Sequence, residues 1–131
     1  MQATDASTAA EEILRRYYDA IDNQRTDEVI ASFEPDATVR PANGTSQPWM
    51  QGMQAMAQQL RGTAGTRHVV TRVVAGEDGQ VAYEVDVTYI LKNGEELTLG
   101  GAAFCRITGN GRFGHMNLYI DLGPVFEALG R

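Results

Sequence analysis

The second half of the chain contains four consecutive β-strand-like stretches separated by turn-forming residues. They are RHVVTRVVA, QVAYEVDVTYIL, LTLGGAAFCRIT and RFGHMNLYID, at residues 67–75, 80–91, 97–108 and 112–121. The separating turns contain Gly76 to Gly79, Asn93-Gly94 and Gly109 to Gly111, which are typical of hairpin connections. Strands joined by short turns pair antiparallel. The pattern therefore predicts an antiparallel meander.

Three helical segments come before these strands. A T-x-x-E capping box at Thr8 and Glu11 begins the first helix, which we expect to end near Asn23. The second is TDEVIASF, stopped by Pro35, and the third runs from Pro48 to Arg61. Their apolar stripes are Ile13, Leu14, Tyr17 and Ile21; Val29, Ile30 and Phe33; and Trp49, Met50, Met53, Met56, Ala57 and Leu60.

This order of elements predicts an α+β domain with the helices packed on one face of the sheet. The segment DATVRPA adds a short strand between the second and third helices. At 131 residues the chain fits one domain. We expect residues 1–7 to form a flexible leader and residues 8–131 to form the domain.

Charge and composition restrict the class of partner. The net charge is −6, which disfavours nucleic acid or an anionic membrane surface as a partner. No apolar run approaches the roughly 18 residues of a membrane span, and no signal-peptide pattern opens the sequence, so we expect a cytoplasmic protein. Cys105 is the single cysteine, and two histidines 47 residues apart make a poor metal site, so we expect neither metal nor cofactor.

Several segments in this order resemble the nuclear-transport-factor-2-like superfamily, and within it the SnoaL-like polyketide cyclase branch. The matching features are ILRRYYDAIDNQRTDEVIASFEPDATVRP, His68 at the opening of a strand, LKNGEELTLGGAAFCRI and LYIDLGPV. The resemblance implies a cone, in which a curved, antiparallel or mixed sheet wraps around three N-terminal helices and leaves a central pocket. The same fold hosts isomerases, epoxide hydrolases, dehydratases and noncatalytic proteins, so it does not fix a reaction.

Strand parity then determines which residues share the pocket face. The resemblance implies that Asp121 points inward, and its strand would place Phe113, His115, Asn117 and Tyr119 on the same side. Glu84 and Asp86 occupy one face of the neighbouring QVAYEVDVTYIL strand. The opposite faces would then form an outward apolar stripe and a dimer interface, made of Val81, Tyr83, Val85, Val87, Tyr89, Met116, Leu118 and Ile120. The alternative is that the apolar faces form the core and the polar faces lie in water.

The resemblance implies an acid/base role for Asp121 in an intramolecular aldol closure, with Asp86 as its carboxylate neighbour. Burial would raise the pKa of such a carboxyl toward neutrality. His115, Asn117 or Tyr119 could donate a hydrogen bond to the developing enolate. Epoxide hydrolysis is less favoured because Glu84 stands where the resemblance requires an arginine.

Further candidate ligand-binding residues are Tyr17, Trp49, Met53, His68, Glu84 and Phe104. For the aromatic and methionine residues, the alternative is helix core, and for His68 it is a structural hydrogen bond. The sequence thus predicts a homodimer that binds a small hydrophobic molecule of polyketide-like or steroid-like character, with cofactor-independent cyclase or isomerase chemistry. The competing hypothesis is a noncatalytic ligand-binding or dimerisation module.

Overall fold

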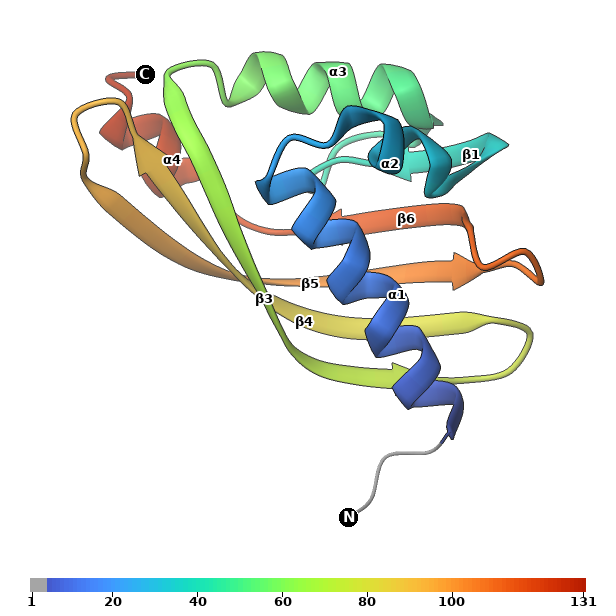
Figure 1. Cartoon of the computed structure of the whole chain (residues 1–131). Coiled ribbons are helices and arrows are strands. Elements are labelled where there is room, and N and C mark those ends of the chain that lie inside the picture. The colour runs from blue at the N-terminus through green and yellow to red at the C-terminus, as the bar shows by residue number, and fades with distance from the viewer. Residues whose placement is uncertain (1–4) are drawn as a thin grey trace.

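A mixed β-sheet with helices on one face forms the framework of the protein (Figure 1). The computed structural model describes residues 5–131. Its helices are α1 (Asp5–Asp22), α2 (Thr26–Ala31), α3 (Trp49–Gln59) and α4 (Gly123–Ala128). Its strands are β1 (Phe33–Arg40), β2 (Gln47–Pro48), β3 (Thr63–Ala75), β4 (Gln80–Leu91), β5 (Glu96–Ile107) and β6 (Phe113–Tyr119).

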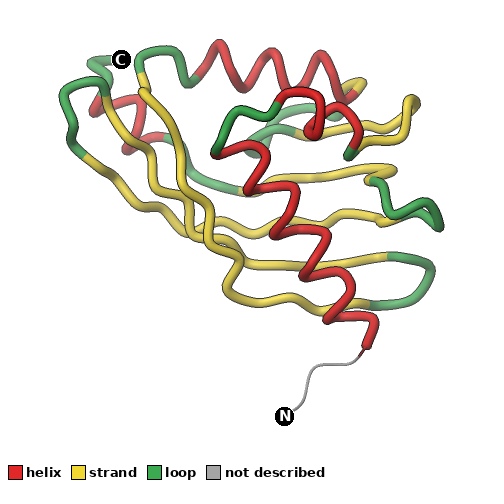
Figure 2. Tube along the Cα trace, in the orientation of Figure 1, coloured by secondary structure: helices red, strands yellow, loops and turns green. Residues whose placement is uncertain are grey.

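Within the described residues, six strands form one open sheet in the order β2-β1-β6-β5-β4-β3. Strands β3 to β6 pair antiparallel in sequence order, and β1 pairs parallel with β6. Figure 2 shows the short turns that join the long strands, as the glycine-containing segments predict. The predicted α+β architecture, with a curved mixed sheet and N-terminal helices, is confirmed.

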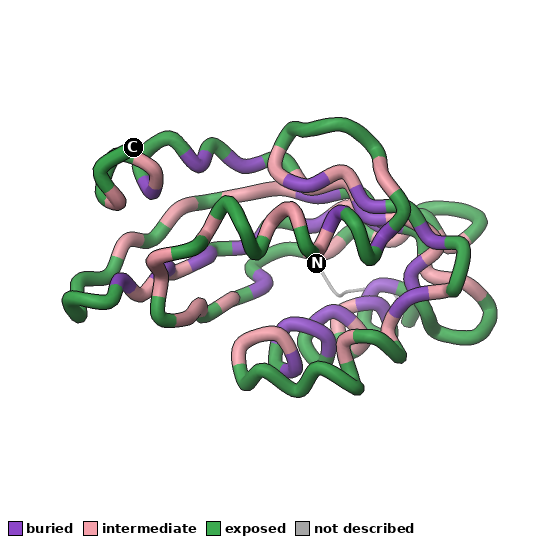
Figure 3. Tube along the Cα trace, turned by 90° about the horizontal axis from the view of Figure 1, so that it is seen from above, coloured by how far each residue is buried: buried purple, intermediate pink, exposed green. Residues whose placement is uncertain are grey.

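The apolar face of the sheet packs against the helices. Alternate β4 residues Val81, Tyr83, Val85, Val87 and Tyr89 are buried, and they share one core cluster with Leu14, Tyr17 and Tyr18 of α1. Helix α1 runs across the strands and contacts β3 (Figure 1). Figure 3 shows buried positions interspersed with exposed ones along the helices and strands. An amphipathic helix and a half-apolar sheet can each bury their apolar side only against the other.

The predicted orientation of the sheet faces is therefore wrong. The stripe expected to face a second subunit is covered by this chain's own helices, and Met116 and Ile120 are buried with it. Leu118 is half-buried against the same core. The polar face that was expected to line a pocket is the outer face of the sheet. Strand parity holds from His115 to Asp121, but the inward direction was inferred from Asp121 rather than from the apolar residues. Phe113 was expected on the polar face and is instead fully buried, because a register shift between β5 and β6 interrupts the alternation there.

Some element boundaries also differ from the sequence prediction. Helix α1 begins at Asp5, three residues before the expected cap, because Ser7 is buried and its hydroxyl accepts a hydrogen bond from the Ala75 amide. The rest of the predicted leader, residues 1–4, lies outside the described residues. Phe33 begins β1 instead of ending α2, and Ile30 is 45% exposed. Met50 and Ala57 are also exposed, although both were placed on the buried stripe of the third helix.

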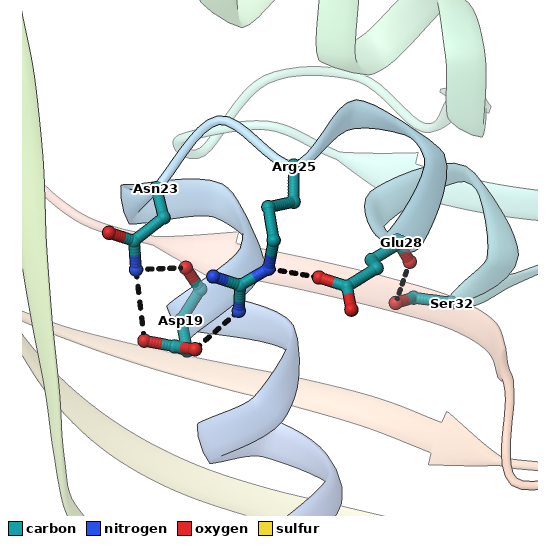
Figure 4. A network of polar contacts seen from close by, with 5 residues as sticks. All are labelled: Asp19, Asn23, Arg25, Glu28 and Ser32. Atoms are coloured by element: carbon teal, nitrogen blue, oxygen red, sulfur yellow. Dashed lines mark hydrogen bonds and ion pairs between the residues drawn. The ribbon is translucent and has the colours of Figure 1, made fainter.

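Polar contacts at the corner between α1 and α2 fix the direction of the chain after α1 (Figure 4). The Arg25 guanidinium contacts the carboxylates of Asp19 and Glu28. The Asn23 amide donates to the Asp19 backbone oxygen at 2.8 Å, and the Ser32 hydroxyl donates to the Glu28 backbone oxygen at 2.8 Å. The charged side chains are exposed, so their ion pairs contribute little free energy.

The β3–β4 turn gives a test of the sheet geometry. Gly79 has a φ of 76°, and a Cβ added there would lie 2.2 Å from the Ile107 backbone oxygen. Gly94 has a φ of 90°, and a Cβ added there would have no neighbouring atom within 4 Å. We expect Gly94→Ala to lower the free energy of unfolding by about 1 kcal/mol through backbone strain alone. Gly79→Ala should lower the free energy of unfolding by clearly more than Gly94→Ala, because its Cβ would also clash with the Ile107 backbone oxygen. Urea denaturation measures both values, and equal effects would contradict the close approach of Gly79 to Ile107.

Candidate functional site

A cavity of about 130 Å³ lies between the concave face of the sheet and helices α1 and α3. Residues from both helices and from four strands contribute to its wall, so only the folded chain assembles it. Its lining consists of Tyr17, Tyr18, Ile21, Val39, Pro41, Gly52, Met53, Met56, Leu60, Thr66, His68, Val85, Val87, Tyr89, Met116 and Leu118.

The lining of this cavity is almost entirely apolar. Among the described residues that form it, none is an aspartate, glutamate, lysine or arginine. Its polar groups are three tyrosines together with Thr66 and His68 on β3. Such a site favours a neutral ligand, because a charged ligand would lose its hydration without gaining a counter-ion.

His68 is held by a carboxylate at the end of α1. Its Nδ1 lies 2.6 Å from Asp22 Oδ1, and its backbone N–H donates to Asp22 Oδ2 at 2.7 Å. The Thr66 hydroxyl donates to Asp22 Oδ1 at 3.0 Å. Asp22 thus accepts from two β3 residues and joins the helix to the strand. This geometry assigns the Nδ1–H tautomer to a neutral His68, which leaves a lone pair on Nε2.

The electrostatics of Asp22 support this arrangement. Burial raises the pKa of the carboxyl, but the hydrogen bonds from the His68 ring and backbone, together with that from Thr66, outweigh burial and bring the pKa below its usual 3.8. Asp22 is therefore a carboxylate at neutral pH. A fixed negative charge beside Nδ1 stabilises an imidazolium that forms when Nε2 takes up a proton.

The tyrosines of the lining remain protonated at neutral pH. Burial raises the pKa of Tyr17, and it raises the pKa of Tyr89 to about 12. The Tyr17 hydroxyl lies 3.9 Å from the Met53 sulfur. Within residues 5–131 the Tyr89 hydroxyl has no hydrogen-bond partner. Both hydroxyls are hydrogen-bond donors suited to an oxygen atom of a ligand.

The structure brings some of the sequence-predicted site residues to the cavity. Tyr17, Met53 and His68 line it, from three separate elements. Trp49 does not. Its indole stacks on Phe33 with ring centroids 4.8 Å apart and planes at 3°, and it is buried in the core.

The remaining candidates on the sheet lie on its outer face. Glu84 and Asp86 are exposed, and the Glu84 carboxylate lies 3.5 Å from the Arg72 guanidinium. Phe104 is 55% exposed and contacts Tyr119 edge-on, with ring centroids 6.2 Å apart. His115 and Asn117 are half-buried on the same face. For His115, burial and the nearby Arg106 charge lower the pKa.

Asp121 is exposed and lies beyond the end of β6. Its Oδ1 accepts a hydrogen bond from the Gly123 amide at 2.9 Å, at the start of α4. The expectation that Asp121 points into the pocket is wrong, because the adjacent Ile120 occupies the inner face. The structure gives Asp121 and Asp86 no place in the cavity lining, and it does not bring them together with His68.

Sequence reasoning missed Asp22, because it is separated from His68 by 46 residues. One signal was available. Asp22 follows Tyr18 by four residues and Ile21 by one, so it lies at the edge of the buried stripe of α1. That position favours a contact with the sheet, but no local pattern identified His68 as the partner.

Two features are absent from the part of the chain that the structure describes. No group of three or more histidine, cysteine, aspartate or glutamate residues there could hold a metal ion. None of the helices in residues 5–131 is long and apolar enough to cross a membrane.

Comparison with known proteins places this geometry in context. A family model described as the SnoaL-like domain matches residues 14–115. The chain is similar to AclR from Streptomyces galilaeus, with 16% identity, a TM-score of 0.77, and coverage of 95% of this chain and 82% of that one. It is also similar to TerC co-crystallised with polyporic acid, with 14% identity, a TM-score of 0.75, and coverage of 94% and 99%.

A third similar structure is an M. tuberculosis LEH-like epoxide hydrolase, with 18% identity, a TM-score of 0.72, and coverage of 95% of this chain and 92% of that one. These identities establish a shared fold rather than a shared reaction. Comparison with curated proteins finds no match.

The contacts of Asp22 predict how stability depends on pH. Because folding lowers the pKa of this carboxyl, its contribution is fully present above about pH 3.8 and is lost as the pH falls through the lower folded-state pKa. The difference in unfolding free energy between the wild type and Asp22→Asn should therefore persist from pH 7 down to about pH 3.8 and shrink as the pH falls further. Urea denaturation at each pH measures this difference. The Gly94→Ala difference, which involves no carboxylate, should stay constant, and a constant Asp22→Asn difference would contradict the assigned contacts.

Proposed function

The chain belongs to the SnoaL-like domain family, and from this membership we propose that it binds a small, neutral, largely apolar molecule and catalyses a cofactor-independent proton transfer of the cyclase or isomerase class. One observation carries the proposal. His68 forms part of the wall of an apolar cavity, while its other side is held by the Asp22 carboxylate. A histidine oriented by a carboxylate is a general acid/base suited to neutral pH.

The proposed chemistry begins with neutral His68. Its Nε2 lone pair takes a proton from a carbon next to a carbonyl group, and the electron pair of the broken C–H bond moves toward the carbonyl oxygen to give an enolate. In an isomerisation, the imidazolium returns the same proton to a different carbon. In a cyclisation, the enolate carbon bonds to a second carbonyl carbon of the same molecule, and the imidazolium protonates the resulting alkoxide.

In the proposed reaction, the tyrosine hydroxyls donate hydrogen bonds to the carbonyl oxygen of the substrate. Tyr17 and Tyr89 line the cavity and stay protonated because burial raises the pKa of each. A donor in a low-dielectric site stabilises an enolate oxygen more than a carbonyl oxygen, which lowers the barrier. Tyr89 is the better candidate, since the Tyr17 hydroxyl already contacts the Met53 sulfur.

The size of the cavity limits the substrate. A volume of about 130 Å³ is close to the roughly 150 Å³ of an apolar protein cavity that holds benzene. One ring of a substrate therefore fits beside His68, and the remainder of a polyketide-like or steroid-like molecule would extend toward the mouth. TerC, co-crystallised with polyporic acid, supports a small organic ligand for this fold.

The noncatalytic alternative is a module that uses the same cavity for binding alone, and the experiment below separates the two. Epoxide hydrolysis, the activity named for the M. tuberculosis neighbour, is not extended to this chain. The sequence hypothesis for that reaction placed it on Asp86 and Asp121, and neither lies in the cavity lining. The cytoplasmic location expected from the sequence stays a prediction.

We also propose that the protein is a homodimer, with the interface on the outer face of the sheet. Exposed apolar side chains lie on this face on β3, β5 and β6, namely Val69, Val74, Phe104 and Tyr119. Glu84, Asp86, Arg72 and Arg106 provide charges of both signs on the same face. A two-fold axis can oppose the acidic part of one copy to the basic part of the other.

The catalytic proposal is tested with 3-cyclohexen-1-one, a neutral single-ring ketone that isomerises to its conjugated form by moving one proton. We expect the wild type to accelerate the formation of 2-cyclohexen-1-one, which is measured by its ultraviolet absorbance. His68→Gln should lower kcat by about 10²- to 10⁴-fold, the usual contribution of general acid/base catalysis. Asp22→Asn should also lower kcat, because it removes the negative charge that stabilises the imidazolium.

Asp121→Asn distinguishes this site from the one inferred from the sequence. It retains side-chain shape and should leave kcat near the wild-type value. Loss of turnover in Asp121→Asn with retention in His68→Gln would reverse the assignment. Binding of cyclohexanone without acceleration by any variant would favour the noncatalytic module.

The dimer proposal is tested by Phe104→Glu. This change places a charge in the centre of the exposed apolar group, so sedimentation equilibrium at micromolar concentration should show a dimer for the wild type and a monomer for the variant. Met50→Glu is the matched control, because Met50 is 49% exposed but lies on α3. A monomeric wild type, or an unchanged mass for Phe104→Glu, would refute the outer-face interface.

A further inference from the structure

The ring of Tyr18 lies almost parallel to the imidazole of His68. The ring centroids are 4.4 Å apart and the planes are inclined by 16°. Both side chains line the apolar cavity, and both also line a second groove on the outer side of α1, where Arg15, Asp19 and Asp22 lie. The stacked pair therefore separates the cavity from this charged, solvent-facing groove.

Tyr18 is itself held in place by its neighbours. Its hydroxyl shares a 2.6 Å hydrogen bond with the hydroxyl of Tyr83 on β4. Its ring contacts Tyr17 edge-on, with centroids 5.0 Å apart and an interplanar angle of 62°. Tyr18 and Tyr83 are both buried. Burial also raises the pKa of each phenol, so both hydroxyls stay protonated and the bond between them persists across the neutral range.

One hydrogen bond does not fix an imidazole ring. The contact between Nδ1 and Asp22 Oδ1 holds one ring atom, but the ring plane can still tilt about that atom, which would move Nε2. A parallel aromatic surface at van der Waals distance removes this freedom, since tilting would sacrifice the stacking contact. The hydroxyl contact with Tyr83 prevents Tyr18 from tilting together with His68.

We infer that Tyr18 is a positioning residue that sets the plane of the His68 imidazole, and that Tyr83 in turn holds Tyr18 through the hydroxyl pair. The orienting path runs from β4 through α1 to β3, so three elements together determine where Nε2 points. The catalytic consequence rests on the proposed function, whereas the orientation of the ring does not depend on any reaction.

The orientation of the His68 ring can be measured by NMR spectroscopy, because the chain contains two histidines and their signals are easily separated. In protein labelled with ¹³C and ¹⁵N on histidine, His68 and His115 give two sets of imidazole signals, and His115 on the outer face serves as the internal reference. Tyr18→Leu deletes the ring current itself, so the orientation is measured from nuclear Overhauser contacts between the His68 ring protons and the methyl groups of Val87, its cross-strand partner, and these contacts should change. The ¹⁵N pattern that reports the Nδ1–H tautomer should persist, because the contact with Asp22 remains. His115 signals should not move. Tyr18→Phe keeps the ring but, like Tyr83→Phe, loses the hydroxyl contact, so its His68 signals should change far less than those of Tyr18→Leu.

Turnover of 3-cyclohexen-1-one supplies the second measurement. Tyr18→Leu should lower kcat by about tenfold with little change in KM, because a misoriented base affects the transition state more than binding. Tyr18→Phe should retain most of the wild-type kcat, because it keeps the aromatic ring. If Tyr18→Leu leaves both the His68–Val87 contacts and kcat unchanged, the inference is wrong.

Tyr83→Phe is a second variant that leaves the stacked pair in place and removes only the hydroxyl contact. Because the Tyr18 ring current is retained, a tilt of the imidazole should appear as a change in the His68 Cε1–H and Cδ2–H shifts, and this variant decides the question if Tyr18→Leu fails to fold. Unchanged His68 shifts in a folded Tyr83→Phe protein would overturn the role of Tyr83. A wild type without turnover refutes the proposed function alone, because the resonance shifts still report whether Tyr18 orients His68.

Discussion

The burial of one apolar sheet face against α1 is the constraint on which the rest of the structure depends. Val85 and Val87 on β4 and Leu14 and Tyr17 on α1 belong to the same core, and neither element could bury its apolar side alone. Once these faces meet, the directions of the other side chains in the sheet follow from the period of two, except where register shifts interrupt the pairing of β1, β3 and β6. The polar residues of β4 to β6 must then lie on the outer face.

The cavity arises where this packing is incomplete. Helices α1 and α3 cover different parts of the concave face, and the space between them is lined by side chains that fill the core elsewhere. The polar groups enter this site from the edge. His68 on the outermost strand meets Asp22 at the end of α1, so the cost of burying a carboxylate is offset by three hydrogen bonds. The site combines an apolar interior with one oriented acid/base group.

Much of the fold followed from local patterns in the sequence. Glycine-containing turns separated strands whose alternation was evident, and helical stripes identified the covering elements. The candidate site was predicted less completely. Tyr17 and Met53 were identified because they lie on inward stripes. His68 was identified because it was expected to open a strand, although β3 begins at Thr63. Asp121 was placed in the pocket from the resemblance alone, and local chemistry explains its real contact, since an aspartate readily accepts from the amide two residues later, here Gly123.

The sequence by itself determined the elements, their order and the division of each strand into a polar and an apolar face, because these depend on neighbours within a few residues. It could not determine which face turned inward, since that choice requires knowing which helix covers which side. Nor could it reveal the contacts of His68 with Asp22 and Tyr18. Residues separated by 46 and 50 positions come together only when α1 docks on β3, and that docking is decided by burial across the whole domain rather than by any local pattern.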